Sequence, residues 1–371
     1  MSSALLTALD DIRPGLEADG FGLFVASVDA GHVTVCLEAR PGACHDRLVP
    51  DDVLQQVVES AIRDADPSVE RVTLVKQVST PHRSTESDMV GASPYGGFFE
   101  ESVTVVTGAG NGIGQATARA LARAGALVVA SDVDLAAAEE TARSIEEEGY
   151  TAWARRVDVT STEDYAAVRD FCLDTWSRVD RVVNNAGLAS TGLPPDLPMG
   201  EWQRIIDVNL LGIVRSNEAF LPVLIRQGHG QLVNTASTSG MFPYAYDRLP
   251  YAATKAAVIA MTEGLALYLR PQGIRVHCVC PAGVRTSMPS RMRHFGPERT
   301  MGTPALPVVT PEAMAATILT GLARDTFLIC SVPEAYEEFA RRGADPQAYL
   351  DGAIARHGFR PLTGPGTDHA G

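Results

Sequence analysis

From residue 102 onward, short apolar runs rich in β-branched residues alternate with stretches of helical periodicity. This alternation is typical of βαβ units, whose parallel strands form a sheet with helices on both faces. The apolar runs that we interpret as strands are residues 102–107, 126–131, 152–157, 179–183, 230–236, 274–279 and 326–331. The pattern predicts an α/β fold with a doubly wound parallel sheet over residues 102–350.

A separate, small α+β unit is predicted for residues 1–78. Helical spacing of leucine and isoleucine over residues 5–16 is followed by a strand hairpin, a second helix and a third strand, in the order αββαβ. Residues 79–101 are mostly Ser, Thr, Gly, Pro and Asp and are predicted to form a flexible linker. Residues 351–371 have few apolar anchors and are predicted to form a C-terminal tail.

The chain has 31 Lys and Arg residues against 45 Asp and Glu residues, a formal net charge of -14 at pH 7. This acidic balance argues against a nucleic-acid partner, because phosphate backbones recruit basic surfaces. The N-terminus lacks a basic segment, and no apolar stretch approaches the roughly 18 residues of a membrane span, so we expect neither a signal peptide nor a membrane partner. The six cysteines lack Cys-x-x-Cys spacing, which indicates reduced thiols, no metal site and a cytoplasmic protein.

A glycine-rich turn connects the first strand of the larger unit to its first helix. It contains Thr107, Gly108, Asn111, Gly112, Ile113 and Gly114. Glycines let the backbone approach a pyrophosphate, and the free N–H groups and positive dipole end of the helix attract the anion. The spacing is Thr-Gly-x-x-x-Gly-x-Gly, which predicts a Rossmann-type dinucleotide site, with a glycine-rich turn that binds no ligand as the alternative.

The acid at the end of the second strand bears on the choice of dinucleotide. Asp132 follows Gly108 at close to the roughly 20-residue offset of an acid that binds the adenosine ribose. A carboxylate there accepts hydrogen bonds from both ribose hydroxyls of NAD and repels the 2′-phosphate of NADP. No Lys or Arg stands in the strand before the glycine turn to offset this repulsion. We therefore expect NAD as the cofactor, and a solvated strand-end aspartate is the alternative.

Tyr251 and Lys255 are four positions apart in a segment of strong helical character, so both side chains lie on one face of the predicted helix. An ammonium beside a phenol stabilises the phenolate and lowers the pKa of the tyrosine. The pair is informative because the chain has only two lysines, Lys76 and Lys255. Tyr251 and Lys255 are therefore candidates for acid–base catalysis.

As an ordered set, these motifs resemble the short-chain dehydrogenase/reductase family over residues 102–335. The matching segments are the glycine turn, Asp132, Asp158-Val159, Asn184-Asn185-Ala186-Gly187, Asn209, Ser237, Tyr251-x-x-x-Lys255 and Pro281-Ala282-Gly283-Val284-x-Thr286. The resemblance implies hydride transfer between nicotinamide C4 and a carbinol or carbonyl carbon. Two features depart from the family pattern: Ser237 and Tyr251 are one residue further apart than is common, and Ala282 replaces the usual glycine.

The resemblance implies four catalytic residues. Tyr251 is implied to be the general base in oxidation and the general acid in reduction, and Lys255 to lower the tyrosine pKa and hold the nicotinamide ribose. Ser237 is implied to donate a hydrogen bond to the substrate oxygen, and Asn209 to anchor a water that relays protons to solvent. Taken singly, Ser237 is also consistent with an ordinary strand-end serine, and Asn209 with a helix cap.

Further residues are implied to bind the cofactor, which carries the redox chemistry while the protein supplies positioning. By resemblance, the adenine is bordered by Asp158 and Val159, the middle of the dinucleotide by Asn185, Ala186 and Gly187, and the nicotinamide amide by Pro281, Gly283, Val284 and Thr286.

Three loops at the carboxyl ends of the strands are predicted to surround the nicotinamide: residues 188–200, 238–250 and 287–309. Their apolar side chains, which include Met241, Phe242, Tyr244, Tyr246, Leu249, Met288, Met292, Phe295, Met301 and Leu306, predict an apolar secondary alcohol or ketone as the substrate. Residues 287–309 are typical of a mobile lid. Candidate partners of a substrate carboxylate or a CoA phosphate are Arg248, Arg291 and Arg293, with solvated arginines as the alternative.

The first unit is similar to the C-terminal domain of NifU-type iron–sulfur scaffold proteins in its element order and in Gly42-Ala43-Cys44. That family continues as Cys-x-x-Cys, but Arg47 stands at the second cysteine position, so we expect no cluster. We predict an interaction or oligomerisation module that contacts a protein partner. A labile metal site built from Cys44, His45 and Asp46 is the competing hypothesis.

The chain as a whole is predicted to be an NAD-dependent oxidoreductase of an apolar secondary alcohol or ketone. One alternative is an NADP-dependent ketone or 3-oxoacyl reductase, against which Asp132 argues. Another is a non-catalytic interaction protein that senses NAD. The resemblance also implies a homodimer or homotetramer, because the family pairs the helices that correspond to residues 200–226 and 251–270.

Overall fold

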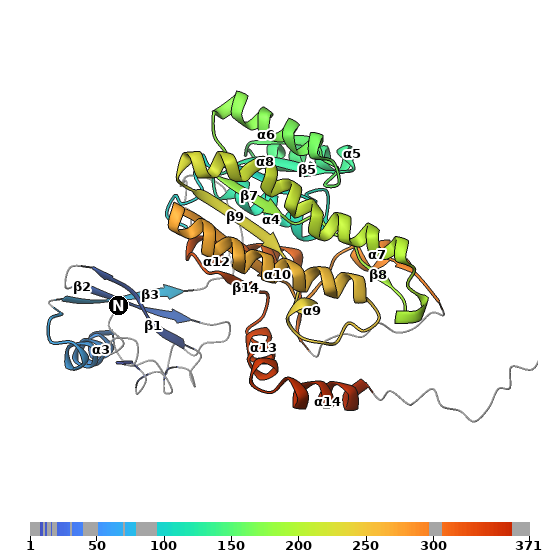
Figure 1. Cartoon of the computed structure of the whole chain (residues 1–371). Coiled ribbons are helices and arrows are strands. Elements are labelled where there is room, and N and C mark those ends of the chain that lie inside the picture. Colours follow the sequence, from blue (N-terminus) through green and yellow to red (C-terminus); the bar gives the residue numbers. More distant parts are fainter. Residues whose placement is uncertain are drawn as a thin grey trace, which may run out of the picture. The chain divides into compact units, whose positions relative to one another are not determined.

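The computed structural model describes residues 8–9, 12, 16, 21–29, 32–39, 51–69, 71–78, 95–296 and 306–357. The chain divides into two compact units, Met1–Val90 and Gly91–Gly371 (Figure 1). The second unit contains the glycine turn and all of the candidate catalytic residues.

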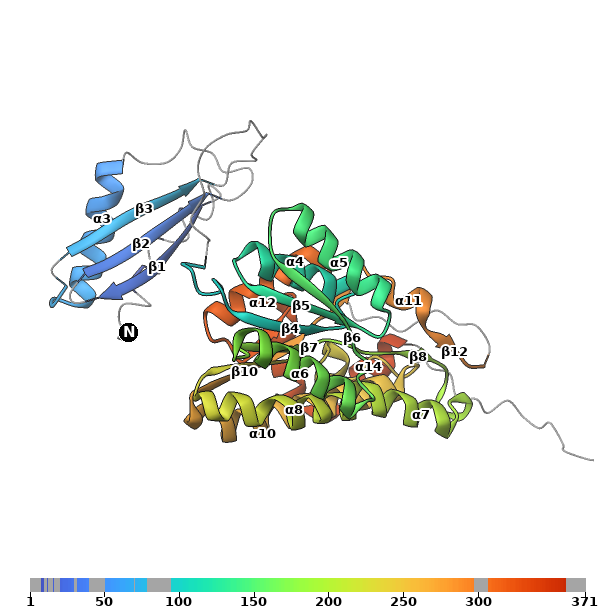
Figure 2. The same cartoon turned by 90° about the horizontal axis from the view of Figure 1, so that it is seen from above.

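The first unit contains one described helix and a three-stranded sheet (Figure 2). β1 (Phe21–Asp29) and β2 (His32–Ala39) form an antiparallel hairpin. β3 (Arg71–Val78) pairs with β2 in parallel, and α3 (Asp51–Ala65) is the helix between these two strands. The predicted hairpin, second helix and third strand are confirmed by these elements.

The core of the first unit lies between α3 and the sheet. Leu54, Val58 and Ile62 repeat at helical spacing and are buried against Val33 and Val35 of β2. The sheet therefore has one apolar face, which the helix covers. Most of the predicted first helix, and the loop that carries the proposed metal-binding cysteine, lie outside the described residues.

The second unit is built on a seven-stranded parallel sheet in the order β14-β10-β9-β7-β4-β5-β6. Its strands are β4 (Val103–Thr107), β5 (Leu127–Asp132), β6 (Ala152–Arg156), β7 (Arg181–Asn184), β9 (Gly230–Thr235), β10 (Ile274–Cys280) and β14 (Leu328–Cys330). Each lies within two residues of a predicted strand. The order reverses between β4 and β7, so the predicted doubly wound α/β sheet is confirmed.

Helices cover both faces of this sheet (Figure 2). One face packs against α4 (Gly112–Arg123), α5 (Leu135–Glu147) and α12 (Pro311–Ala323). The other face packs against α6 (Thr162–Trp176), α8 (Gly212–Gln227) and α10 (Leu249–Leu269). Within β4, Val105 lies in the core on one face and Val106 in the core on the other, as the period-2 geometry of a strand requires.

Shorter elements complete the edge of the sheet at which the strands end. The short helices at this edge are η2 (Pro194–Asp196), α7 (Met199–Ile206), the π-helix η3 (Asp207–Leu211), α9 (Thr238–Met241) and α11 (Met288–Arg291). A further short helix, η4 (Arg270–Gln272), lies at the opposite edge, directly before β10. Two short parallel pairs join β8 (Ser190–Thr191) to β12 (Arg293–His294), and β11 (Gly283–Val284) to β13 (Val308–Val309). The helices α13 (Glu334–Ala344) and α14 (Pro346–His357) follow the last strand.

The predicted boundaries of the linker and the tail need correction. Phe99 is fully buried, and its ring makes edge-to-face contacts with Tyr95 and Phe98 at centroid distances of 5.1 and 4.9 Å. The guanidinium of Arg181 lies 4.6 Å from the centre of the Phe99 ring. Residues 95–101 thus belong to the second unit and not to a linker. At the other end, α14 continues to residue 357, whereas the rest of the predicted tail lies outside the described residues.

Two helical segments, Met199–Gln227 and Leu249–Gln272, are long and apolar enough to cross a membrane, contrary to the sequence expectation. Each contributes buried side chains to the unit, such as Phe220 and Leu224 from the first and Leu269 from the second. A core helix of a sheet protein meets the same criterion of length and apolarity, so this finding is weak evidence for a membrane span.

The correction of the linker boundary generates a stability prediction. We expect Phe99→Ala to lower the free energy of unfolding of the second unit by about 3–5 kcal/mol, because it leaves a cavity in a packed core. Urea unfolding followed by tryptophan fluorescence measures this unit alone, since Trp153, Trp176 and Trp202 all lie in it. Tyr150→Ala is the control, because Tyr150 is 40% exposed and its loss should cost below about 0.5 kcal/mol. If the two substitutions lowered the free energy of unfolding equally, Phe99 would not be a core residue and the predicted linker boundary at residue 101 would stand.

Candidate active site

A cavity of about 500 Å³ lies where the central strands end. The predicted site residues that line it are Gly108, Asn111, Gly112, Ile113, Asp132, Asp158, Val159, Asn185, Ala186, Gly187, Ser237, Tyr251, Lys255, Pro281, Val284 and Thr286. Four predicted residues are not among its lining residues: Thr107, Gly114, Asn209 and Gly283. The structure therefore gathers most of a set that spans almost 180 residues of sequence around one space.

The glycine turn brings the N-terminus of α4 to this cavity. Gly108 has a φ of +65°, a conformation that side chains with a Cβ rarely adopt, and an added Cβ would lie 2.9 Å from Ala186 Cα. Asn111 is the N-cap of α4, and no side-chain hydrogen bond caps the first turn. The N–H groups of this turn are thus available to a bound anion, and the donor set fits a diphosphate.

The end of β7 holds the glycine turn in place. Asn185 Nδ2 donates to the backbone oxygens of Thr107 (3.2 Å) and Gly108 (3.3 Å). In return, Thr107 Oγ1 accepts hydrogen bonds from the N–H groups of Asn185 (3.1 Å) and Ala186 (3.3 Å). Thr107 is itself buried, so it acts from behind the cavity by fixing the turn.

Two carboxylates lie on the cavity wall at the ends of β5 and β6. Asp132 accepts hydrogen bonds from the N–H groups of Gly110 (2.9 Å) and Asp134 (3.1 Å), so it both lines the cavity and orders the glycine turn. Asp158 accepts from the backbone N–H (2.9 Å) and hydroxyl (2.7 Å) of Thr160, which lower the pKa of its carboxyl. Asp132 is therefore more than a solvated strand-end residue.

The candidate acid–base residues come from β9 and α10. Tyr251 and Lys255 lie one turn apart on α10, and Lys255 Nζ is 5.6 Å from the centre of the Tyr251 ring. The ammonium donates to the backbone oxygen of Thr235 at 2.6 Å. Ser237 stands at the N-cap of α9, where its hydroxyl oxygen accepts from the N–H of Ser239 at 3.2 Å. All three side chains thus reach the cavity from rigid elements.

Burial shifts the pKa values of both α10 residues toward their neutral forms. Removal from water raises the pKa of Tyr251 to about 12, and its hydrogen bond with Ser237 and the charge of Arg248 oppose this shift only in part. Removal from water also lowers the pKa of Lys255 to about 8. The shift of the Tyr251 pKa is opposite to the one that the Tyr–Lys spacing predicts, because desolvation of the phenolate outweighs the hydrogen bond from Ser237 and the charge of Arg248.

Asn209 lies in the π-helix η3, immediately behind the cavity, and is completely buried. Its side chain accepts from the N–H of Leu188 (2.7 Å) and donates to the Leu188 oxygen (2.9 Å) and to Thr254 Oγ1 (3.2 Å). It therefore joins the loop after β7 to α10 and does not act as a helix cap. Single-turn π segments within α-helices occur frequently at functional sites.

The segment after β10 closes the cavity beside the glycine turn. An added Cβ at Gly112 would lie 3.1 Å from Thr286 Cγ2, and Ser287 Oγ donates to Asn111 Oδ1 at 3.2 Å. Gly283 does not line the cavity but pairs with Val308 in the β11–β13 ladder. The segment is thus joined to the turn that it covers.

Part of the predicted apolar lining lies elsewhere in the structure. Met241 and Phe242 are buried in a separate core and do not line the cavity. The C-terminal helices cover them, since Arg342 donates to the Met241 backbone oxygen at 3.0 Å and the Tyr349 ring lies 6.4 Å from that of Phe242. These two side chains stabilise the loop after Ser237 and are not substrate contacts.

Thr160, Arg204 and Val208 also line the cavity and were not predicted as site residues, whereas Leu188 and Ala189 belong to the loop 188–200 that was predicted to surround the nicotinamide. Arg204 and Val208 are four residues apart, about one helical turn, where α7 continues into the π-helix η3. That spacing, together with the position of Asn209, could have indicated this wall from sequence. Of the arginines proposed for a substrate anion, only Arg291 lines the cavity. Arg248 is buried beside Asp247, and Arg293 bonds to Glu201.

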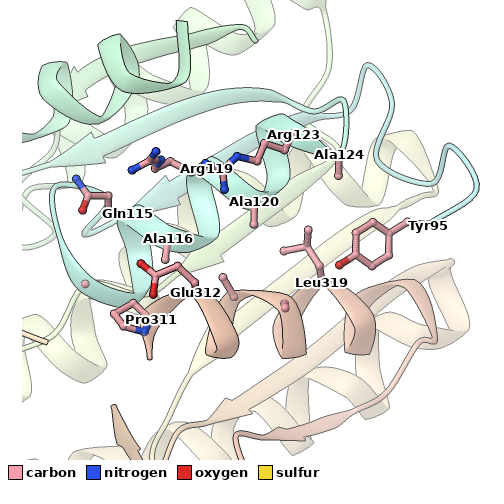
Figure 3. Close-up of a pocket in the computed structure, with 13 residues that line it drawn as sticks. Tyr95, Gln115, Ala116, Arg119, Ala120, Arg123, Ala124, Pro311, Glu312 and Leu319 are labelled. Atoms are coloured by element: carbon pink, nitrogen blue, oxygen red, sulfur yellow. The ribbon is translucent and has the colours of Figure 1, made fainter. Parts of the chain in front are cut away.

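A second cavity, of about 510 Å³, lies between α4 and α12 (Figure 3). Arg119 and Arg123 extend from α4 on one side, and Glu312 and Leu319 lie on α12 opposite. Both arginines already pair with Glu148, from Arg123 Nε at 2.6 Å. Of the predicted site residues only Gly112 reaches this groove, so we assign the chemistry to the first cavity.

Comparison with known proteins agrees with this geometry. The family model described as short chain dehydrogenase matches residues 102–295. Cyclohexanol dehydrogenase of Acinetobacter sp. (strain SE19) is 35% identical over 191 residues, which cover 51% of this chain and 76% of that protein. Cis-4-hydroxycyclohexanecarboxylate dehydrogenase of Sinomonas cyclohexanicum is 35% identical over 223 residues, which cover 58% of this chain and 89% of that protein.

A solved structure shows the same relationship at the level of the fold. The short chain dehydrogenase/reductase of Burkholderia phymatum, crystallised in complex with NAD, is similar with a TM-score of 0.59 and 27% identity. The similarity covers 71% of this chain and 99% of that one. The residues that match the family model, 102–295, contain the strands from β4 to β10 and the helix α10, which carries Tyr251 and Lys255. The chain belongs to the short-chain dehydrogenase family of oxidoreductases.

Proposed function

We propose that this chain is an NAD-dependent dehydrogenase that transfers hydride between the cofactor and an apolar secondary alcohol or ketone. The observation that carries the proposal is that Ser237, Tyr251 and Lys255 line the same cavity as the uncapped N-terminus of α4. A diphosphate bound at the helix would hold the rest of the dinucleotide beside the acid–base residues. Positioning of this kind supplies much of the rate enhancement in two-substrate reactions.

In the proposed reaction, the chain's own residues move a proton while nicotinamide, when bound, accepts or donates the hydride at C4. Tyr251 removes the hydroxyl proton in oxidation and returns it in reduction. Ser237 donates a hydrogen bond to the substrate oxygen and stabilises the negative charge that develops there. Lys255 holds its ammonium beside the phenol and the cofactor ribose, anchored to the Thr235 oxygen.

We propose that Asn209 and Lys255 line the route by which the proton reaches solvent. The two side chains approach each other at Gly187, where an added Cβ would lie 3.4 Å from Asn209 Oδ1 and 3.5 Å from Lys255 Nζ. A larger residue at this position would fill the space that a relay water needs. Asn209 would thus contribute both by holding Leu188 and by bordering the relay.

NAD is proposed over NADP because of the charge at the end of β5. Asp132 lines the cavity, and its two oxygens keep free lone pairs beyond the hydrogen bonds from Gly110 and Asp134. A 2′-phosphate at this position would be repelled by the carboxylate. The complex of the Burkholderia phymatum relative with NAD supports the same choice.

The substrate class is proposed from apolar side chains that line the same cavity as the acid–base residues. Leu188, Ala189, Val208 and Met288 contribute apolar surface to this cavity. The names of the two relatives, a cyclohexanol dehydrogenase and a cis-4-hydroxycyclohexanecarboxylate dehydrogenase, support a cyclic secondary alcohol. Arg291 on the cavity wall would suit a carboxylate substituent on such a ring.

We also propose a cytoplasmic homodimer or homotetramer with the first unit as its protein-interaction module, similar to a NifU C-terminal domain without a cluster. Exposed apolar side chains on η3, α8 and α10 favour pairing of these helices, namely Leu211, Val214, Leu267 and Tyr268. Four of the cysteines, Cys172, Cys278, Cys280 and Cys330, are free and buried, as in a reducing compartment.

The cofactor proposal predicts a preference that a titration measures without any substrate. We expect the protein to bind NADH at least about 100-fold more tightly than NADPH, read by nicotinamide fluorescence at fixed ionic strength. Asp132→Asn should narrow this ratio by about tenfold, because it removes the charge but keeps an acceptor for the Gly110 N–H. Asp132→Ala is the second comparison and should also loosen the glycine turn. Tighter binding of NADPH by the unaltered protein would favour the ketone-reductase alternative, and binding of neither would end the dinucleotide proposal.

The catalytic proposal predicts that Tyr251→Phe lowers kcat for cyclohexanol oxidation by about 10²–10⁴-fold and leaves the Kd for NADH within about twofold. Because burial raises the pKa of Tyr251 to about 12, the phenolate fraction rises with pH, so kcat/KM for oxidation should increase from pH 6 to 9. Reduction of cyclohexanone uses the protonated phenol and should lack this rise. Tyr150→Phe, on the exposed surface, is the matched control. Turnover by Tyr251→Phe at the rate of the unaltered protein would remove Tyr251 from the mechanism.

A further inference from the structure

One buried carboxylate near the cavity is used neither by the cofactor site nor by the acid–base residues. Glu201 lies in α7 with a side chain only 3% exposed. Its oxygens accept hydrogen bonds from Ser190 Oγ, from Arg204 Nε at 3.1 and 3.2 Å, and from Arg293 at 3.2 Å. The donors come from β8, from α7 itself and from β12, so a single carboxylate joins three segments.

Each of these segments continues into the wall of the catalytic cavity. β8 follows directly on Leu188 and Ala189, and Arg204 itself lines the cavity. β12 follows α11, which contributes Met288 and Arg291 to the wall. The carboxylate therefore connects the part of the wall that leaves β7 to the part that leaves β10, which are about 100 residues apart in sequence.

Backbone contacts beside Glu201 join the same two segments, β8 and β12. β12 lies beside β8 (Figure 2) and pairs with it in parallel. In this pairing Arg293 is opposite Ser190 and His294 is opposite Thr191. The N–H of Phe295 donates to the Thr191 oxygen at 2.8 Å, and the Thr191 hydroxyl bonds to His294 Nδ1 at 2.7 Å. A ladder of only two residues on each strand is short, so it depends on side-chain support.

The charges around Glu201 explain how that support works. Hydrogen bonds from Arg204, Ser190 and Arg293 hold the pKa of Glu201 at about 2, so the carboxylate stays ionised at neutral pH. Arg204 is on the same helix and compensates the buried charge locally. Arg293 is 62% exposed and arrives from the other segment, so its bond can break without leaving a buried cation unpaired.

We infer that Glu201 is a positioning residue that fastens α11 and β12 over the substrate side of the cavity, with Arg293 as its removable partner. The consequence for catalysis rests on the proposed function, because Met288 and Arg291 would contact the alcohol and not the dinucleotide's adenine end. With the fastening broken, the wall would open and the alcohol would bind more weakly, whereas the groups on β9 and α10 would keep their geometry. The effect therefore falls on KM and not on kcat.

The test compares Arg293→Met, which keeps the alkyl stem and removes the charge, with the unaltered full-length protein. We expect amide hydrogen exchange in the peptide that contains Phe295 to be about fivefold faster, which at 1.4 kcal/mol per factor of ten corresponds to ~1 kcal/mol. The KM for cyclohexanol should rise by a similar factor, with kcat and the Kd for NADH within about twofold. Arg293→Lys restores a cation and should recover part of both effects.

The matched control is Arg143→Met, which removes an exposed arginine from an ion pair with Glu140 on α5. It should change neither the exchange at Phe295 nor the KM. Glu201→Gln is the second variant and should speed exchange at least as much as Arg293→Met does, since it weakens both guanidinium bonds.

The outcomes separate this inference from the proposed function. Unchanged exchange at Phe295 in Arg293→Met would overturn the fastening whatever the enzyme's activity. Faster exchange with an unchanged KM, or with a loss of kcat alone, would overturn the positioning role. Failure of the unaltered protein to oxidise cyclohexanol would contradict the proposed substrate, and the exchange experiment would still decide whether Glu201 fastens the wall.

Discussion

The close approach between the glycine turn and the end of β7 is the constraint on which the rest of the site depends. An added Cβ at Gly108 would lie 2.9 Å from Ala186 Cα, and one at Gly114 would lie 2.5 Å from Asn185 Nδ2, so the turn and the start of α4 both pack directly against the residues that follow β7. That closeness lets one side-chain amide, that of Asn185, reach the oxygens of both Thr107 and Gly108. The α4 N–H groups are left facing the cavity, and the anion site is thus made of backbone, whose position side-chain rotation cannot change.

The sheet and the motif residues could be predicted from sequence because each depends on a local pattern. Strands covered on both faces are continuous apolar runs, and all seven were found within two residues of their observed bounds. The glycine turn and the Tyr251–Lys255 pair likewise lie within windows of eight residues or fewer. The predictions from sequence failed where a residue's environment depends on contacts with residues far away in the sequence. Phe99 follows a run of small and polar residues, and what makes it a core residue is Arg181 and the helices packed beside it.

The part of the cavity wall proposed to contact the substrate gives a second example of an environment that depends on distant residues. Glu201 and Arg204 are three residues apart and look like an ordinary ion pair on an exposed helix. The burial of Glu201 depends on β12, some 90 residues later, and on the two-residue pairing of that strand with β8. Phe242 shows the converse error. Its apolar side chain and its place in a loop at the strand ends predicted a substrate contact, but it is buried in a core beside Tyr349 of the C-terminal helices. For Glu201 and for Phe242, the element that buries the side chain is too far away in the sequence for a local pattern to reveal it.

Burial of the acid–base pair has a consequence for the direction of the reaction. The environment raises the pKa of Tyr251 to about 12 and lowers that of Lys255 to about 8, so it disfavours charge on both groups. A neutral phenol is already the form that a general acid requires, and reduction of a ketone can begin from it. Oxidation requires the phenolate, whose formation needs a further positive charge within a few ångström. The oxidised nicotinamide carries such a charge and the reduced one does not. The oxidised cofactor would therefore lower the pKa of Tyr251, which favours oxidation of an alcohol, and the reduced cofactor would leave it high, which favours reduction of a ketone.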